Sequence, residues 1–460
     1  MTRPAIIPFL FAMLVLAGVA AFGGLTACGD DDDDNEASAA ADDDDDTSDD
    51  DTDDDDTTGD DDDTGDDDTV DDDTADDDTA DDDTGDDDTG DDDTIDEYFD
   101  PKEWGPYPVG NRRYVFIDED RPDDRPSDGP RTLLTDVWYP ATDESTDLPR
   151  TRVGDFLTPW ENKVSLLFGL AGAPDDELAN FDNLTHSAFE APIRADAGPF
   201  PIVFVSHGNM SLRFAHWTLC EYLASHGYVV VSVDHIGNAI FVTLPDRLVL
   251  FNFLHYPVAL INRKADMRFL VDTFTALNDD DPDGVFTGMI DTDAVGALGH
   301  SFGGRTLIDW VPEDERVVAA VDMAAMADPA EVAKTDASWM LMAAGEDNTI
   351  GEWHPVSATA ENPAKVVAME ILDAGHYTFS EACYLMPTLF GDGDGCGTGH
   401  RHDGGAEFEY LDPAVGFDIM NSYVTAFFGY HLKNQDEMLP DLTTNRYPEE
   451  MLFEVTSVED

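Results

Sequence analysis

One hexapeptide of the sequence has the residue types and spacing of a catalytic nucleophile. GHSFGG places Ser301 between Gly299 and Gly303, the G-x-S-x-G pattern of a serine on a tight strand-to-helix turn. The pattern alone is common by chance, and an ordinary serine N-cap is the alternative. Its surroundings favour the nucleophile, because the apolar run AVGALGH before it predicts a strand and FGGRTLIDW after it predicts a helix.

A nucleophilic serine needs a base and an acid, expected in the chain order Ser, acid, His. His376 in LDAGHYTFSEAC follows the last apolar strand, so we predict it as the base; a surface-loop histidine is the alternative. Asp322 ends the strand RVVAAVD, and Asp347 follows the next strand in MLMAAGEDNT. Ends of adjacent parallel strands lie about 5 Å apart. Either carboxylate could therefore reach the histidine, and the residues alone do not decide between them.

The oxyanion of such a reaction needs two backbone donors, and the sequence offers two positions for them. SHGN at 206–209 follows the buried run PIVFVSH, so we predict the N–H of Asn209 as one donor and that of Phe302 as the other. His207 precedes the serine and is predicted to stabilise this loop rather than to act as the base. His400 and His402 in GHRHDGG have no third ligand at set spacing, so we predict no metal site.

The elements that must position these residues alternate between strands and helices. Apolar strands recur between helical stretches such as INRKADMRFLVDTFTAL and VGFDIMNSYVTAFFGYHL. This alternation predicts an α/β domain over 101–460, with a mostly parallel central sheet and helices on both faces. Two apolar-rich insertions, 153–181 and 236–261, are expected to be lids over the site or, equally, ordinary core helices.

The first 28 residues have the features of an export signal. Arg3, the apolar run IIPFLFAMLVLAGVAAF and the small-residue stretch LTAC predict a signal peptide. LTAC resembles a bacterial lipoprotein box, which implies that Cys28 is lipidated and anchors the protein in the cell envelope. Gly29, rather than an aspartate, follows Cys28, and this favours the outer over the inner membrane. A lone transmembrane anchor is the alternative, although the apolar run is shorter than the ~20 residues a span needs.

Residues 29–100 are dominated by aspartate. They hold about 43 of the 103 acidic residues, mostly in DDDT repeats, with no Lys or Arg. Such a segment cannot bury apolar surface, so we predict a disordered tether; calcium binding is the alternative, but the spacing of an EF-hand is missing. The net charge of −80 disfavours nucleic acid as a partner.

Three cysteines remain once Cys28 is assigned to lipidation. Export to an oxidising compartment permits a disulfide. Cys383 and Cys396 flank a glycine-rich loop that follows His376, so we predict that they pair. Cys220 lies in the predicted helix HWTLCEYL and is expected to stay a buried free thiol.

From about Trp104 to Leu432 the sequence resembles the α/β-hydrolase superfamily, in the branch of platelet-activating-factor acetylhydrolases and dienelactone-hydrolase-like esterases. The stretches that carry the resemblance are GPYPVG, DVWYPA, FVSHGN, LASHGYVVVSVDH, GHSFGG and AGHYTFSE. The resemblance implies a serine ester hydrolase without a cofactor, acting on short-chain, lipid or phospholipid-type acyl esters. Dienelactone hydrolase itself uses cysteine, so that activity is disfavoured. Polyester-degrading cutinases share the layout, and a catalytically idle binding protein is the remaining alternative.

The resemblance also bears on the acid of the triad. The acetylhydrolases take their acid from the earlier strand, which favours Asp322. In that family Ala-Trp-Met follows the aspartate, whereas MAAM follows Asp322 here. We therefore predict Asp322 and keep Asp347 as the alternative.

Overall fold

The computed structural model describes residues 99–123, 129–332, 334–361, 366–390, 394–402 and 405–455. The predicted signal peptide, Cys28 and nearly all of the predicted acidic tether lie outside the described residues.

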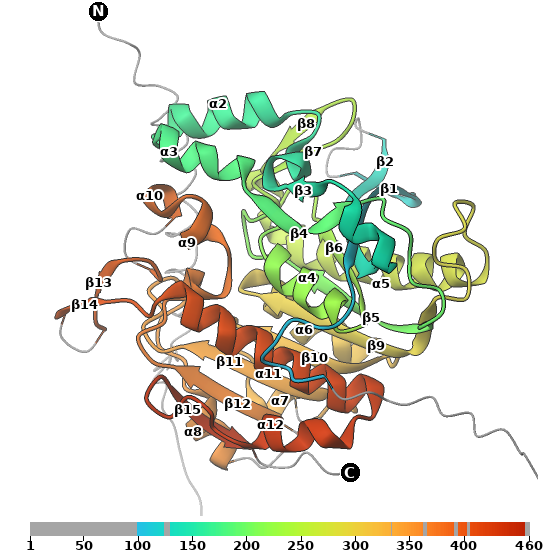
Figure 1. Cartoon of the computed structure of the whole chain (residues 1–460). Coiled ribbons are helices and arrows are strands. Elements are labelled where there is room, and N and C mark those ends of the chain that lie inside the picture. Colours follow the sequence, from blue (N-terminus) through green and yellow to red (C-terminus); the bar gives the residue numbers. More distant parts are fainter. Residues whose placement is uncertain are drawn as a thin grey trace, which may run out of the picture. The chain divides into compact units, whose positions relative to one another are not determined.

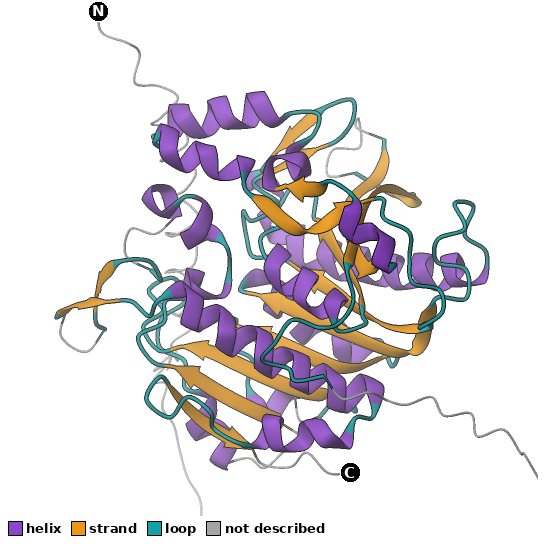
Figure 2. Cartoon of the chain, viewed as in Figure 1, coloured by secondary structure: helices purple, strands orange, loops and turns teal. Residues whose placement is uncertain are grey.

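One eleven-stranded sheet organises the described residues (Figures 1 and 2). Its central strands, from β6 through β5, β9, β10 and β11 to β12, run parallel. Antiparallel strands flank them, with β2 beside β6 and β15 beside β12. In sheet order the strands are β15 (Met451–Val455), β12 (Val366–Ile371), β11 (Ser338–Ala344), β10 (Val317–Met323), β9 (Ile290–His300), β5 (Phe200–Ser206), β6 (Val229–Asp234), β2 (Pro130–Pro140), β1 (Val109–Pro122), β4 (Leu184–Phe189) and β3 (Arg150–Arg152).

Helices cover both faces of the sheet because its central strands are apolar on both sides. Alternate residues of β10 enter opposite cores: Val321 packs in the core under α4 and α11, and Ala320 packs in the core under α5 and α6. Figure 1 shows α4 and α11 crossing one face. The helices are α2 (Glu161–Ala171), α3 (Asp175–Leu178), α4 (Trp217–Ser225), α5 (Tyr256–Asp279), α6 (Phe302–Trp310), α7 (Pro329–Val332), α8 (Pro355–Glu361), α9 (Ala382–Leu385), α10 (Pro387–Phe390), α11 (Pro413–Lys433) and α12 (Leu439–Thr443).

This arrangement confirms the predicted fold class and adds elements that the sequence pattern did not indicate. The edge strand β15 and the short strands β3 and β4 were not predicted. The insertion 153–181 contains α2, α3 and the 3-10 turns η3 (Val153–Leu157) and η4 (Ala179–Asp182). The insertion 236–261 forms a hairpin of β7 (Phe241–Thr243) and β8 (Leu248–Leu250), then η5 (Phe253–His255) and the start of α5.

Within the described ranges, no helix combines the length and apolar character that a membrane span requires.

Candidate active site

Ser301 occupies a strained turn between β9 and α6. Its φ of 54° and ψ of −121° lie where non-glycine residues are rarely found, a strain that is typical of functional sites. A Cβ on Gly303 would lie 1.8 Å from the backbone oxygen of Ser206, so only glycine lets the turn pack against the end of β5. The turn therefore has the geometry predicted for a nucleophile elbow.

His376 begins the 3-10 turn η7 (His376–Phe379) that follows β12 and pairs with a buried aspartate. Its Nδ1 lies 2.7 Å from Oδ2 of Asp347, which follows β11. Asp347 is held in turn, because its Oδ1 accepts hydrogen bonds from the N–H groups of Thr349 and Ile350, each at 2.9 Å. Burial opposes the charged form of His376, yet the nearby carboxylate of Asp347 raises the pKa of the imidazole above its ordinary value.

We predicted Asp322 as the partner of His376, and this prediction is wrong. The structure pairs His376 with the alternative, Asp347. Asp322 lies in β10 between Val321 and Met323, whose side chains enter the core under α4 and α11. Side chains alternate along a strand, so Asp322 faces the opposite side, beneath α6. Its Oδ2 accepts the N–H of Ala327 at 3.1 Å, and a Cβ on Gly304 would lie 2.0 Å from its Oδ1.

Asp394 was not singled out from the sequence, yet it joins the loops that carry His376 and Asp347. Its Oδ1 accepts the N–H of His376 at 2.8 Å and that of Asn348 at 2.9 Å. Its Oδ2 accepts the hydroxyl of Thr349 at 2.6 Å. Burial and the charge of Asp347 raise the pKa of Asp394. No local signal marks this residue, because it is one of two aspartates in the glycine-rich stretch GDGDGCGTG.

The predicted disulfide between Cys383 and Cys396 is present, with Cα atoms 5.5 Å apart. It closes the loop that contains Asp394 and joins that loop to α9, directly after the His376 turn. Cys220 is a buried free thiol, as predicted, and burial raises its pKa.

The two predicted oxyanion donors lie on either side of Ser301 in sequence, and Asn209 lines the same cavity as Ser301. A Cβ on Gly208, the residue before Asn209, would lie 3.4 Å from Cβ of Ser301. Phe302 is the first residue of α6, so its N–H has no intrahelical acceptor. Among the described residues, no acceptor is found for the N–H of Asn209 either. His207 is buried in this loop, as predicted for a loop-stabilising residue.

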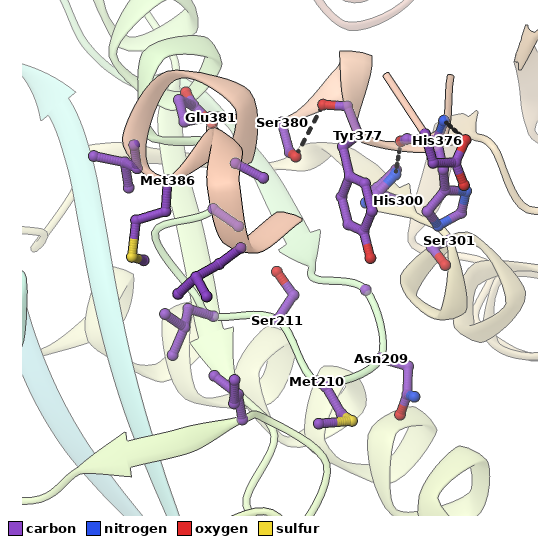
Figure 3. Close-up of a pocket in the computed structure, with 18 of the residues that line it drawn as sticks. Asn209, Met210, Ser211, His300, Ser301, His376, Tyr377, Ser380, Glu381 and Met386 are labelled. Atoms are coloured by element: carbon purple, nitrogen blue, oxygen red, sulfur yellow. Dashed lines mark hydrogen bonds between the residues drawn. The ribbon is translucent and has the colours of Figure 1, made fainter. Parts of the chain in front are cut away.

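A mainly apolar cavity of about 360 Å³ opens beside Ser301. Figure 3 shows Ser301 and His376 at one side of it and Met386 at the opposite side. Both insertions contribute to its wall, Phe168 and Phe181 from the first and Ile240 from the second. The other apolar lining residues are Met210, Leu212, Phe214, Ala215, Ala382, Leu385 and Leu389.

Hydrogen bonds join the first insertion to α9 and α10 around this cavity. Asn180 Nδ2 donates to the backbone oxygen of Leu385 at 2.9 Å, and the N–H of Thr388 donates to Glu177 Oε1 at 3.0 Å. The insertion 153–181 is therefore part of the cavity wall rather than an ordinary core helix.

The histidines other than His376 form no recognisable metal centre in the described residues. His300 is buried, donates from Nε2 to the backbone oxygen of His376 at 3.0 Å, and has its pKa lowered well below the ordinary value by burial. His400 lies on β13 (Thr398–His400), which pairs with β14 (Glu407–Glu409). No group of three His, Cys, Asp or Glu side chains able to hold a metal occurs in the part of the chain that the structure describes.

A serine elbow after the central strand β9 and a histidine turn after β12, on a mostly parallel sheet, define the class of α/β-hydrolases. Within this class, residues 100–246 match the family of platelet-activating factor acetylhydrolase, isoform II. The matched region includes the loop of Asn209 and ends before Ser301. It confirms the predicted resemblance to acetylhydrolases and indicates a carboxylic ester hydrolase.

A solved structure with a similar fold is a ferulic acid esterase from Streptomyces cinnamoneus. The likeness has a TM-score of 0.57 at 24% sequence identity and covers 75% of this chain and 96% of the esterase. At this identity it establishes the α/β-hydrolase fold. No curated protein matches the sequence.

Proposed function

We propose that the chain hydrolyses carboxylic esters through Ser301, His376 and Asp347. The observation that carries this proposal is that a strained serine and a buried His–Asp pair meet at one apolar cavity. A catalytically idle binding protein would not need the φ of 54° at Ser301, because simple binding does not require a strained backbone at this serine.

In the proposed mechanism His376 accepts the proton of Ser301 Oγ as that oxygen attacks the ester carbonyl carbon. Asp347 accepts the hydrogen bond from Nδ1–H, which fixes the tautomer and stabilises the imidazolium. The N–H groups of Asn209 and Phe302 stabilise the oxyanion. The alcohol leaves with the proton held by His376, and water then releases the acyl group from Ser301.

The cavity favours a substrate whose bound part is apolar and neutral. Its described lining contains no Lys or Arg, and the carboxylates of Asp394 and Glu381 border it. Both features disfavour an anionic group. Short-chain and lipid-type acyl esters therefore fit the proposal. An aromatic acyl ester, the substrate type named for the ferulic acid esterase, is a second candidate because the rings of Phe168, Phe181 and Phe214 line the wall.

We further propose that the enzyme is exported and lipid-anchored at Cys28, in the outer rather than the inner membrane. The support is the sequence of the first 28 residues, and the aspartate-rich residues 29–100 would act as the spacer. Replacing Cys28 by serine should move the protein from the membrane fraction to the soluble fraction. Unchanged membrane association of this variant would disprove the lipid anchor.

The decisive experiment compares wild type and Ser301→Ala on p-nitrophenyl esters of increasing chain length, p-nitrophenyl ferulate, phospholipids and a solid polyester. We expect the variant to lose activity about a thousandfold or more, because triad members act as a unit. It should also lose labelling by a fluorophosphonate. Ser225→Ala, a buried serine at the end of α4, is the matched control. Equal activity in wild type and Ser301→Ala would contradict the proposal.

A further inference from the structure

Arg263 of α5 is a fully buried arginine that contacts the loop of the predicted oxyanion donor Asn209. Its Nη1 donates to the backbone oxygen of His207 at 2.5 Å, and its Nη2 donates to that of Gly208 at 2.9 Å. A buried guanidinium is costly unless its donors are used, and here they are directed at a loop rather than at a carboxylate. The free-energy cost of burying this guanidinium indicates that a fixed conformation of the Asn209 loop is needed.

The bond to Gly208 fixes the direction of the next N–H group. In a trans peptide the C=O and the N–H point in opposite directions. The bond between Gly208 and Asn209 is not among the cis peptides of the structure. Because the Gly208 oxygen points at Arg263, the Asn209 N–H points away from Arg263. Asn209 and Ser301 both line the cavity.

His207 supports the same orientation. Its Nδ1 lies 2.7 Å from the Gly208 oxygen, and its Nε2 accepts the N–H of His235 at 3.2 Å. Both contacts are satisfied only by the neutral ring with its proton on Nδ1. Burial and the charge of Arg263 lower the pKa of His207, which favours this neutral form. The Gly208 oxygen thus accepts two hydrogen bonds that a rotated peptide would lose.

Arg263 also reaches Asn209 through Asn238. Its Nε donates to Asn238 Oδ1 at 2.8 Å, and Asn238 Nδ2 donates to Asn209 Oδ1 at 2.7 Å. The backbone oxygen of Asn238 accepts the N–H of Met210 at 3.0 Å. The residue that carries the donor is therefore held through its side chain and through the next peptide.

The second predicted donor, Phe302, touches the same guanidinium. The centre of the Arg263 guanidinium lies 5.0 Å from the centroid of the Phe302 ring. On the same helix as Arg263, Tyr256 stacks with that ring at 5.6 Å. One side chain thus contacts elements of both halves of the predicted oxyanion hole.

We propose that Arg263 is a positioning residue that holds the Gly208–Asn209 peptide with its N–H toward the oxyanion. Without it, Gly208 has the backbone freedom to let this peptide rotate, which would turn a carbonyl oxygen toward the developing negative charge. The inference rests on the proposed ester hydrolysis and deepens it.

The test measures kcat and KM of the full chain on one p-nitrophenyl ester for Arg263→Gln and Arg263→Lys. We expect Arg263→Gln to lower kcat about a hundredfold with little change in KM, since one oxyanion donor contributes ~10²–10³ in kcat. The kcat of Arg263→Lys should lie between those of Arg263→Gln and wild type, because an ammonium replaces only some of the hydrogen bonds of the guanidinium. Arg131→Lys is the matched control, since Arg131 is equally buried and pairs with Asp266 of α5.

A second measurement separates positioning from simple loss of folding. An alkyl boronic acid forms a tetrahedral adduct on serine, so its inhibition constant should rise by the same factor as kcat/KM falls. Binding of the product carboxylic acid should stay nearly constant. The end point of fluorophosphonate labelling counts folded sites, and kcat is calculated per labelled site.

Wild-type kcat per labelled site in Arg263→Gln would overturn the inference, and so would equal weakening of boronic acid and product. If Arg263→Gln does not fold, Asn238→Ala decides, with a fall in kcat of about tenfold or more expected and an unchanged kcat overturning the proposal. Wild type that neither hydrolyses esters nor labels at Ser301 would overturn the proposed function as well. An active wild type with unaffected Arg263 variants would overturn this inference alone.

Discussion

The two sides of the active site are held in different ways. Ser301 and the loop of Asn209 follow directly from the ends of β9 and β5, and α6 and the buried Arg263 support them. His376 and Asp347 lie on loops after β12 and β11. The acid–base side is joined by the carboxylate of Asp394 and by a disulfide rather than by regular elements.

This difference separates local from long-range determinants of the site. A glycine pattern next to a strand and a helix suffices to set the elbow, because the constraint is the close approach of neighbouring backbone. The position of His376 relative to Asp347 depends instead on contacts between segments distant in sequence. The Ser301 elbow should therefore tolerate changes in distant loops, whereas the acid–base side should be sensitive to them.

The largest effect on turnover that tests this difference between the two sides is expected at Asp347. Asp347→Asn should lower kcat by as much as ~10⁴-fold, because asparagine favours the wrong tautomer of the histidine. The same change should move the acid limb of the pH–activity profile to lower pH, because Asp347 raises the pKa of His376 and the neutral imidazole is the active form. Steady-state kinetics between pH 5 and pH 9 measure both effects.

Asp322→Asn is the matched control for this experiment. Asp322 lies near the end of the neighbouring strand and is equally buried, but it faces α6 instead of His376. It should retain nearly full turnover. A dead Asp322→Asn beside an active Asp347→Asn would show that the earlier strand supplies the acid after all.

On both sides of the active site, the sequence predicted local features better than contacts between segments distant in sequence. The elbow, the alternation of strands and helices, the His376 loop and the Cys383–Cys396 pair all follow from local patterns. The choice between Asp322 and Asp347 does not follow from a local pattern. The strand β10 is buried on both faces, so it has no polar–apolar alternation that would reveal which way Asp322 points. Asp394 and Arg263 were missed since only the folded chain brings them to the site.

A smaller effect on turnover is expected from removing the disulfide. Replacing Cys383 and Cys396 by serine opens the loop that carries Asp394 and should lower the free energy of unfolding by about 3 kcal/mol. Because Asp394 bonds the N–H of His376, we also expect kcat to fall about tenfold through misplacement of the imidazole. Urea denaturation and kinetics at 25 °C measure the two effects.

The control for this variant is Cys220→Ala, which removes the described free thiol and leaves the disulfide in place. It should leave kcat unchanged. Equal urea midpoints for the double variant and wild type, with equal kcat, would mean that the acid–base side does not depend on the covalent link.

The smallest effect on turnover is expected at Asp322. Replacing this residue should instead change how the free energy of unfolding depends on pH. Burial raises the pKa of Asp322 from 3.8 to about 7. Below pH 4 both the folded and the unfolded chain are protonated at this position. As the pH rises from 4 to 7 the unfolded chain loses its proton first, so the free energy of unfolding falls. Above pH 7 this fall ends.

The Asp322→Asn variant removes this pH dependence. Its stability relative to wild type should therefore increase with pH, by up to about 4 kcal/mol at ~1.4 kcal/mol per pKa unit. Urea denaturation at pH 5 and pH 8 measures the difference, with Asp196→Asn, whose side chain is 79% exposed, as the control. A difference between Asp322→Asn and wild type that is the same at both pH values would mean that the Asp322 carboxyl does not titrate in this buried position.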